Sequence, residues 1–435
     1  MPRRVLILSY YFPPSGGPGV QRVLKTVKYL PNRGWKPTVL TVDAGAYPEH
    51  DPTLWDDVRP GTRLERTSSW DPYQWYARFT GKGDDAVALG SVEGKQASWK
   101  ERVAQWVRAN VFLPDARVGW VPFAVQRGYS LLQNRPFDAI LTSGPPHSTH
   151  LSGALLQALT GVPWVADFRD PWTDINYYHE LPHTALARRL DAALERMVLR
   201  RADAVTTVSP HWRDLLARKA ETSRNDRFAV VQNGFDTADV QPRRSVVSDD
   251  VFALTHVGSL YASRNPTALW AALKRLQNTS DVPRLRIRLV GSVAPVVTEA
   301  LREYRLTSIT EHVPYVPHEE AVTYMQRAAL LLLSIEDFPH AAGMMTGKIY
   351  EYLAAGRPVL GIGPEEGDAA HLLDTTGGGA LFGREDADGI AQFIRAHYET
   401  WASGTPQTGA DAAVLAPYTR EAQTHVLAEV LGGVA

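Results

Sequence analysis

The sequence contains no cysteine among its 435 residues. Disulfide bonds, zinc sites built on cysteine and cysteine nucleophiles are therefore excluded. Net charge is almost absent as well, because the formal charge at pH 7 is -1 with 21% charged residues. Such a chain has no overall field that would attract a polyanion. We expect no nucleic-acid partner.

Long hydrophobic runs are also missing. The longest, AALLLLSI at residues 328–335, is less than half of the ~20 residues that a membrane-spanning helix needs. The N-terminal stretch MPRRVLILSYYF has the arginines and the apolar run of a signal peptide, but no small-residue cleavage site follows it. It continues directly into PPSGG, so we interpret it as a first buried strand. These features predict a cytoplasmic protein, with or without a peripheral contact to the inner face of the membrane.

What is present is enough chain for two domains, because a single core stops growing at roughly 250–300 residues. Short Val/Ile/Leu runs alternate with longer helical stretches, which is typical of parallel sheets covered by helices. The polar stretch at residues 236–250 interrupts this alternation, so we predict domains at residues 1–240 and 241–418. The last helical segment, residues 419–435, either caps the second domain or crosses back to the first. The predicted strands are RVLILSYY, PTVLTV, DAILTS, PWVADF, AVTTVS, AVVQN, FALTHVG, RIRLVG, ALLLLSI and RPVLGI.

The alternation also fails around residues 50–136, a segment crowded with Trp, Tyr and Arg. It includes WDPYQWYARF and WKERVAQWVRANVFLPDARVGW. Aromatic and basic side chains together suit a membrane interface, where Lys100, Arg102 and Arg108 would meet the headgroups. An inserted helical subdomain that uses the aromatics as its core explains the composition equally. Both interpretations stay open on the sequence.

A glycine-rich turn follows the first predicted strand. In FPPSGGPGVQR, Gly17 precedes a helix with apolar residues at Val23, Val27 and Leu30. Glycine permits positive φ and a close backbone approach, so the free N–H groups at the helix N-terminus could hold an anion. The dinucleotide fingerprint G-x-G-x-x-G is not matched, because Arg22 stands at its third glycine position. A tight turn without a ligand is the alternative.

Two more strands of the first half end in polar residues. DAILTS runs into GPPHSTHLSG, and PWVADF runs into RDPWTDINYYHE. Ligands of open α/β sheets bind at such strand ends. We therefore expect five candidates to converge near one wall of a cleft, namely Arg169, Asp170, Asp174, His147 and His150. Of these, His147, His150 and Asp174 are the acceptor-side candidates. The alternatives are a capping or structural role for Asp170 and ordinary loop positions for the histidines. No spacing in these loops suits a metal ion, so we expect none.

In the second half, LTHVGSLYASRNP ends a strand at Gly258 and delivers Arg264, which can make charge-assisted bonds to phosphate oxygens for which Gly258 leaves room. The stretch TGKIYEYLAAGRPVLGI predicts a helix from near Met345, with Lys348 in its first turn and Glu351 on the same face. A cation there opposes the helix dipole by roughly 0.3–1 kcal/mol, which favours a bound anion. Glu351 can accept two hydroxyls, such as a ribose diol. A solvated Arg264 and a plain Lys348–Glu351 ion pair are the alternatives.

Seven motifs in order resemble the retaining, nucleotide-sugar-dependent glycosyltransferases of the GT-B fold, specifically family four. They are FPPSGGPGVQR, ADFRDPW, ADAVTTVSP, VQNGFD, HVGSLYASR, EYLAAGRPVLGI and YTREAQ, and they span nearly the whole chain. The resemblance implies an α/β protein with two doubly wound, Rossmann-like domains facing each other across a cleft, the second binding the nucleotide, and a last helix that crosses back to the first. It implies no cofactor beyond a nucleoside diphosphate sugar as co-substrate, and a saccharide or lipid-linked acceptor.

The resemblance also implies roles for individual residues. It places Glu351 at the donor ribose, Arg264 at the diphosphate and Gly17 in the glycine loop near the diphosphate. Asp170 and Arg169 fall where many relatives have a histidine near the reacting sugar. We expect the catalytic residues to be Asp170, Arg169, Arg264 and Lys348. The expected donor-binding set is Gly17, Gly258, Arg264, Tyr315, Met345, Thr346, Gly347, Lys348 and Glu351.

The sequence departs from the family pattern at two positions. The family glutamate that precedes the ribose glutamate by eight positions is Gly343 here, and the arginine after the strand glycine is Ser259. Lys348 would then replace the missing phosphate contact. These departures keep two other functions open, namely a GT-B sugar nucleotide epimerase and a non-catalytic nucleotide-sugar-binding protein.

Overall fold

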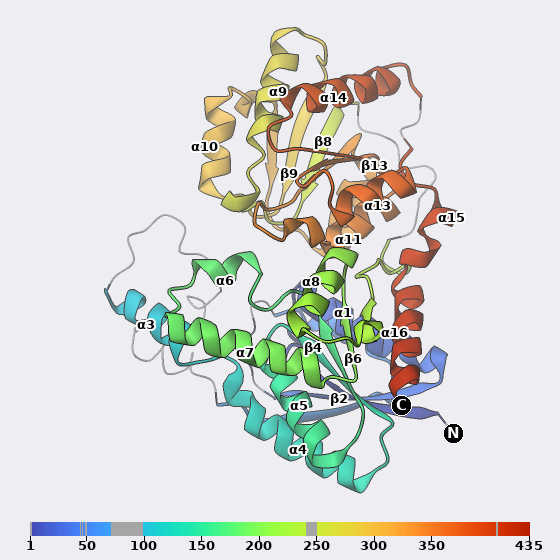
Figure 1. The fold of residues 1–435 in the computed structure, drawn as a ribbon. Coiled ribbons are helices and arrows are strands. Elements are labelled where there is room, and N and C mark those ends of the chain that lie inside the picture. The colour runs from blue at the N-terminus through green and yellow to red at the C-terminus, as the bar shows by residue number, and fades with distance from the viewer. Residues whose placement is uncertain are drawn as a thin grey trace. The chain divides into compact units, whose positions relative to one another are not determined.

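The structure is a computed structural model that describes residues 2–43, 45, 47, 50–70, 99–240, 250–405 and 408–435. The chain forms two compact units. Unit 1 comprises Met1–Gln232 and Gln423–Ala435, and unit 2 comprises Asn233–Ala422. Each unit is a parallel sheet with helices on both sides (Figure 1). The aromatic stretch WDPYQWYARF lies mostly outside the described residues, as does the Lys100 side chain.

Unit 1 contains a seven-stranded sheet in the order β3-β2-β1-β4-β5-β6-β7, with every pair parallel. The strands are β1 (Arg3–Leu8), β2 (Trp35–Val42), β3 (Arg63–Thr67), β4 (Ala139–Gly144), β5 (Trp164–Phe168), β6 (Ala204–Thr207) and β7 (Phe228–Val230). The order reverses between β1 and β4. Open α/β sheets bind their ligands at the carboxyl ends of the strands beside such a reversal.

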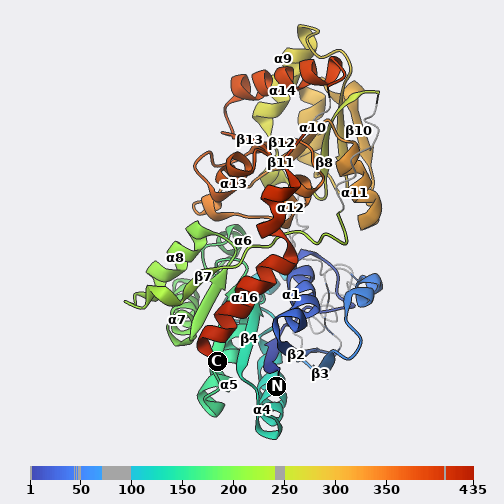
Figure 2. The same cartoon turned by 90° about the vertical axis from the view of Figure 1, so that its right-hand side faces the viewer.

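Side chains of β1 alternate between two cores, as the two-residue period of a strand requires. Leu6 and Leu8 face the core under α4 (Val121–Asn134), α5 (Ser148–Thr160), α7 (Ala185–Arg201) and α8 (Pro210–Ala220). Val5 and Ile7 face the core under α1 (Pro18–Tyr29) and α16 (Arg420–Val434). Figure 2 shows α16 beside α1. The helices of unit 1 are α1 (Pro18–Tyr29), α3 (Trp99–Asn110), α4 (Val121–Asn134), α5 (Ser148–Thr160), α6 (Asn176–Glu180), α7 (Ala185–Arg201), α8 (Pro210–Ala220) and most of α16 (Arg420–Val434).

Unit 2 contains a six-stranded parallel sheet in the order β10-β9-β8-β11-β12-β13. Its strands are β8 (Phe252–Val257), β9 (Leu285–Val290), β10 (Thr310–Val313), β11 (Leu330–Ser334), β12 (Val359–Ile362) and β13 (Gly379–Phe382). Its helices are α9 (Thr267–Asn278), α10 (Pro295–Glu303), α11 (His318–Arg327), α12 (Gly347–Ala354), α13 (Asp368–Thr376), α14 (Ala387–Ala402) and α15 (Ala412–Leu415). The strand order reverses between β8 and β11, so the second candidate edge follows these two strands.

The structure contains three strands that the sequence did not predict, namely β3, β10 and β13. All three lie at sheet edges, and none of their residues is buried. An edge strand has no need of the continuous apolar run that marks a strand buried on both faces, so hydrophobic pattern alone does not reveal it. Within the described residues, no helix combines the length and the apolar character needed to cross a membrane.

Candidate functional site

The loops after β8 and β11 meet at the strand-order reversal of unit 2. Gly258 ends β8 with a φ of 104°, and the following turn carries Arg264. The Arg264 Nε donates to Glu336 Oε1 at 2.8 Å, and Glu336, just past β11, is 5% exposed. The Ser334 hydroxyl donates to the Arg264 carbonyl at 2.6 Å. These bonds hold the Arg264 side chain by one nitrogen, and its two terminal nitrogens make no hydrogen bond to any described residue.

Helix α12 begins at the same edge, after Thr346. Thr346 is its N-cap residue, but the Thr346 side chain makes no capping hydrogen bond. The hydroxyl of Thr346 is buried and has no partner among the described residues. Because the first N–H groups of a helix have no partner within the helix, this end of α12 can receive an anion. Met345 is buried, and its carbonyl accepts from Asn233 Nδ2 at 3.0 Å.

The Lys348 ammonium lies over Gly258. A β-carbon built on Gly258 would stand 2.5 Å from Lys348 Nζ. The space at this glycine is therefore occupied by Lys348, which corrects the expectation that it is left for phosphate oxygens. Burial, reinforced by the nearby positive charge of Arg264, lowers the pKa of Lys348 to about 8. Two cations thus share one small region, an arrangement that an anionic ligand would stabilise.

Glu351 stands one helical turn after Lys348, yet the two do not form an ion pair. No hydrogen bond or salt bridge joins the Glu351 carboxylate to a described residue. Burial raises the pKa of Glu351 and Asp239 adds to the rise, against the effects of His318 and Arg420. An ion pair between Lys348 and Glu351 therefore does not explain why these two residues lie on one face of α12. Glu351 is partly buried. A carboxylate that has lost part of its hydration without gaining a partner is destabilised, and hydroxyl donors of a ligand would lower that cost.

Gly347 and Tyr315 were also expected to bind the donor, and they lie in different surroundings. Gly347 is the first residue of α12, with open space around its Cα. Tyr315 lies between β10 and α11 and is 79% exposed, and no hydrogen bond joins it to any described residue of the group. Gly343 is buried and, having no side chain, offers none to a ligand.

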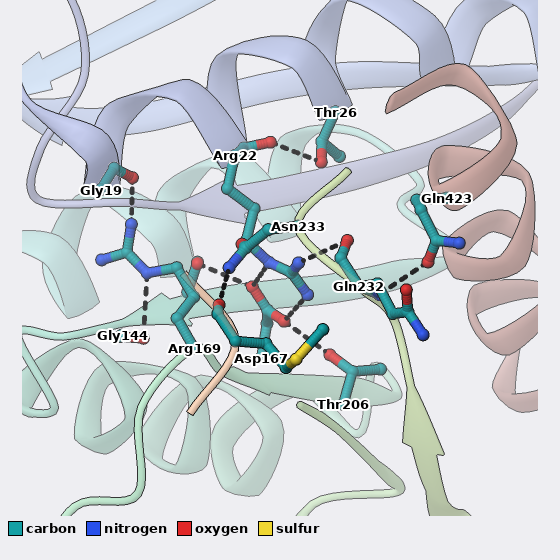
Figure 3. A network of polar contacts seen from close by, with 12 residues as sticks. Gly19, Arg22, Thr26, Gly144, Asp167, Arg169, Thr206, Gln232, Asn233 and Gln423 are labelled. Carbon is teal, nitrogen blue, oxygen red and sulfur yellow. Dashed lines mark hydrogen bonds and ion pairs between the residues drawn. The ribbon is translucent and has the colours of Figure 1, made fainter. Parts of the chain in front are cut away.

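At the matching edge of unit 1, the central feature is a buried ion pair (Figure 3). Asp167 of β5 accepts from Arg22 Nε at 2.9 Å and Nη2 at 2.7 Å, and from the hydroxyls of Ser143 and Thr206, each at 2.8 Å. Burial opposes ionisation of Asp167, but Arg22 and these donors lower its pKa. Arg22 Nη1 also donates to the Gln232 carbonyl at 3.1 Å. The network fixes α1 against the sheet, and with it Gly17, the N-cap of α1 at a φ of 92°.

Arg169 is fully engaged with the main chain. Its Nε donates to the Gly144 carbonyl at 3.1 Å, and one terminal nitrogen donates to the Gly19 carbonyl (Figure 3). The other terminal nitrogen donates to the Pro145 carbonyl. The guanidinium therefore joins the loop after β4 to the start of α1. This geometry favours a positioning role over the direct catalytic role expected from the sequence. Asp170 follows it and is only partly buried.

The two histidines after β4 are buried and stacked. His147 lies on Trp172 with ring centroids 5.0 Å apart, and His150 lies on Phe168 at 4.4 Å. Burial lowers the pKa of both, to about 3 for His150, so both are neutral at pH 7. His150 Nδ1 bonds to the Thr142 hydroxyl at 2.8 Å, whereas neither ring nitrogen of His147 has a hydrogen-bond partner among the described residues. His150 Nε2 likewise has no partner among the described residues, so His147 keeps two ring nitrogens and His150 one for a bond to a ligand.

Asp174 belongs to a structural cluster. Its carboxylate pairs with Lys219, whose ammonium also lies 2.5 Å from Glu195 and donates to the Thr173 hydroxyl at 2.6 Å. This pairing favours a structural role for Asp174 over binding of an acceptor. Across the described residues, no group of three or more potential metal ligands is arranged to hold an ion.

Three groups that shape these edges were not predicted from the sequence, namely Glu336, the Arg22–Asp167 pair and Lys219. Glu336 could have been identified from the sequence, because an acidic residue directly after the apolar run of β11 stands where ligands of α/β sheets bind. The partners of Asp167 and Lys219 come from distant segments, and no local pattern marks them.

Comparisons with known proteins place the chain in a family. The model described as a glycosyl transferase 4-like domain matches residues 16–234, and that of glycosyl transferases group 1 matches residues 252–400. No curated protein matches the chain. Solved structures match over nearly their whole length at low identity, which shows the fold alone.

Three of these structures illustrate the range. HepE of Anabaena, solved with UDP and glucose, has a TM-score of 0.63 and 16% identity, over 98% of this chain and 99% of its own. WaaG, a glycosyltransferase involved in lipopolysaccharide biosynthesis, has a TM-score of 0.53 and 15% identity, over 98% and 95%. A Listeria monocytogenes protein assigned as a UDP-N-acetylglucosamine 2-epimerase has a TM-score of 0.54 and 11% identity, over 98% and 95%. The chain belongs to the family-four glycosyltransferases of the GT-B fold, with a glycosyl transferase 4-like domain followed by a group 1 domain.

Proposed function

We propose that this glycosyltransferase moves a hexose-type sugar, with retention of configuration, from a nucleoside diphosphate sugar to a hydroxyl of a saccharide or lipid-linked acceptor. The observation that carries the proposal is the group formed by Arg264, Lys348, the uncapped start of α12 and the unpartnered Glu351. Two cations and free N–H groups suit a diphosphate, and a carboxylate one turn away suits a ribose diol. The lipopolysaccharide role of WaaG supports a place in bacterial polysaccharide or glycolipid assembly, at the cytoplasmic face of the membrane.

The chemical step requires charge stabilisation on the leaving group. The bond between the sugar C1 and the phosphate oxygen breaks, its electron pair stays on the diphosphate, and the acceptor oxygen forms the new bond to C1 as its proton is released. Arg264, Lys348 and the N–H groups of α12 would offset the charge that develops on the diphosphate. These groups supply what a divalent cation would supply, so we propose transfer without a metal ion.

On the acceptor side, His147 and Asp170 are the candidates that the geometry of unit 1 leaves open. His147 is neutral and has two ring nitrogens without partners among the described residues, so it can bond to a hydroxyl. We propose that Arg169 acts through the loops that it joins, and that Asp174 serves the Lys219 cluster.

A panel of nucleoside diphosphate sugars tests the function, each incubated with and without EDTA. We expect release of the nucleoside diphosphate, by transfer or slow hydrolysis, at the same rate in both conditions. Formation of an isomerised nucleotide sugar would establish the epimerase instead, a function favoured by the fold shared with the Listeria protein. Binding without turnover would show a decayed enzyme, and loss of activity in EDTA that magnesium or manganese restores would contradict metal independence.

The pKa of Lys348 predicts how binding of the nucleoside diphosphate responds to pH. Since the Lys348 side chain has a pKa of about 8 when no ligand is bound, it is mostly charged at pH 7 and mostly neutral at pH 9. A bound diphosphate favours the charged form and raises this pKa, so affinity should fall as pH rises through 8. Titration calorimetry between pH 6.5 and 9.5 measures the effect. In the Lys348→Met variant the slope above pH 8 should disappear; an unchanged slope would show that another group titrates.

A further inference from the structure

The outward face of α7 carries no acid. Both acidic residues of the helix, Asp191 and Glu195, are 0% exposed. Asp191 accepts from Trp172 Nε1 at 2.8 Å, and Glu195 pairs with Lys219 at 2.5 Å. The exposed face consists mainly of leucines and arginines, namely Leu186, Leu190, Arg189, Arg196, Arg200 and Arg201. With 100° per residue, these positions point away from Asp191 and Glu195.

The positive charge of this face is only partly neutralised. Glu221 pairs with Arg200 at 2.7 Å and with Arg196 at 3.8 Å, and it is itself exposed. Arg189 and Arg201 have no ion pair with any described residue. Leu186 is 67% exposed and Leu190 50%, so two leucines one turn apart stand in water among cations.

Helix α3 exposes an apolar face of its own. Trp99 is 67% exposed, Val103 49% and Trp106 47%. Spacings of four and three residues place the three side chains on one side of the helix. Arg102 is exposed next to them. The face that a helix of a globular protein normally buries is therefore presented to solvent here.

The two faces belong to one surface, because the helices meet end to end. Asn110, the last residue of α3, donates from Nδ2 to the Pro182 carbonyl at 3.0 Å. Its Oδ1 accepts from the main-chain N–H of Thr184 at 2.7 Å, and Thr184 caps α7. Figure 1 shows α3 reaching the N-terminal end of α7. Trp106 stands one turn before Asn110 and Leu186 two residues after Thr184, so both flank this junction, while Trp99 lies at the far end of α3 and the arginines lie farther along α7.

We infer that this α3–α7 surface docks on an anionic lipid membrane. Tryptophan and leucine side chains settle at the boundary between headgroups and acyl chains, and arginines beside them meet lipid phosphates. The positive charge of the surface, together with its exposed apolar side chains, favours an anionic membrane over two other partners. A second copy of the chain would set arginine against arginine, and a nucleic acid would leave the leucines uncovered. The inference goes beyond the proposed transfer reaction and does not depend on it.

Sedimentation of the full chain with vesicles tests the surface. We expect binding to vesicles of phosphatidylglycerol and phosphatidylcholine, weaker binding at high salt, and little binding to phosphatidylcholine alone. The arginine variant R189Q/R201Q should reduce affinity roughly 30-fold, at roughly 1 kcal/mol for each of the two cations. The leucine variant L186S/L190S should reduce it further and leave the salt dependence unchanged.

Two matched control variants distinguish binding through the α3–α7 surface from nonspecific binding to vesicles. L155S/L159S removes another exposed pair of leucines one turn apart, on α5, and R33Q/R135Q neutralises two exposed arginines elsewhere in unit 1. Both controls should bind vesicles like the wild type, and all four variants should melt at the wild-type temperature. The inference is overturned if the chain does not bind anionic vesicles, if controls and test variants lose binding equally, or if L186S/L190S instead abolishes a dimer.

Discussion

Replacing either cation at the start of α12 is expected to lower turnover by about 10²–10³-fold, the usual cost of losing one electrostatic donor to a developing negative charge. Lys348→Ala and Arg264→Ala both remove charge opposite the leaving diphosphate, so both should lower kcat. The nucleoside alone, which carries no phosphate, should bind both variants as tightly as it binds the wild type. Steady-state kinetics with the donor identified in the panel, and calorimetry with the nucleoside, measure the two effects.

Glu351→Ala should fail differently. Its carboxylate is proposed to bind the ribose in the ground state and the transition state alike, so its loss should raise KM with little change in kcat. Affinity for nucleoside and nucleoside diphosphate should fall together. If Glu351→Ala folds normally and binds the nucleoside like the wild type, the donor site is not at α12.

The effects on folding and on catalysis must be separated for Arg264, because its removal breaks the 2.8 Å ion pair with the buried Glu336. The double variant R264A/E336Q removes the uncompensated carboxylate charge. If the double variant recovers the melting temperature but not kcat, the loss in Arg264→Ala belongs to the chemical step. Lys274→Ala, on α9 and away from the loops after β8 and β11, is the control for removal of a cation and should keep wild-type kinetics.

Asp167→Ala should strongly destabilise unit 1. It would remove the carboxylate that pairs with Arg22, whose side chain is only 5% exposed. Breaking such a pair from one side costs about 3–5 kcal/mol. For a unit of this size, each kcal/mol lowers the melting temperature by roughly 2–4 °C. Calorimetry should therefore show the transition of unit 1 lowered by roughly 6–20 °C.

The matched control is the exposed ion pair of Arg275 and Asp388 in unit 2, whose side chains are 56% and 85% exposed. Asp388→Ala should cost at most about 1 kcal/mol, because surface pairs contribute little. Equal melting temperatures for the two variants would contradict a structural role for the buried pair. Since the pKa of Asp167 is lowered in the folded state, its contribution should be complete above the carboxyl pKa of the unfolded chain and lost as pH falls below it.

The inner strands of both sheets could be predicted from the sequence for a simple physical reason. A parallel strand covered on both faces must be apolar throughout, and all five residues of β11, Leu330–Ser334, are buried. The edge strands β3, β10 and β13 have no such requirement and carry no such pattern. Pairing with a neighbour, rather than composition, makes them strands.

The same division holds for the candidate site. Local sequence pattern was enough to predict that Arg264 follows a strand and that Lys348 and Glu351 share one face of a helix, because strand ends and helical spacing are local properties. Three contacts emerged only from the folded structure: Glu336 holds Arg264, Lys348 lies over Gly258 and not on Glu351, and the Arg169 guanidinium donates to main-chain carbonyls. Each of these contacts joins residues from separate segments of the chain. Their choice of partner depends on distances and burial, which exist only once the chain has folded.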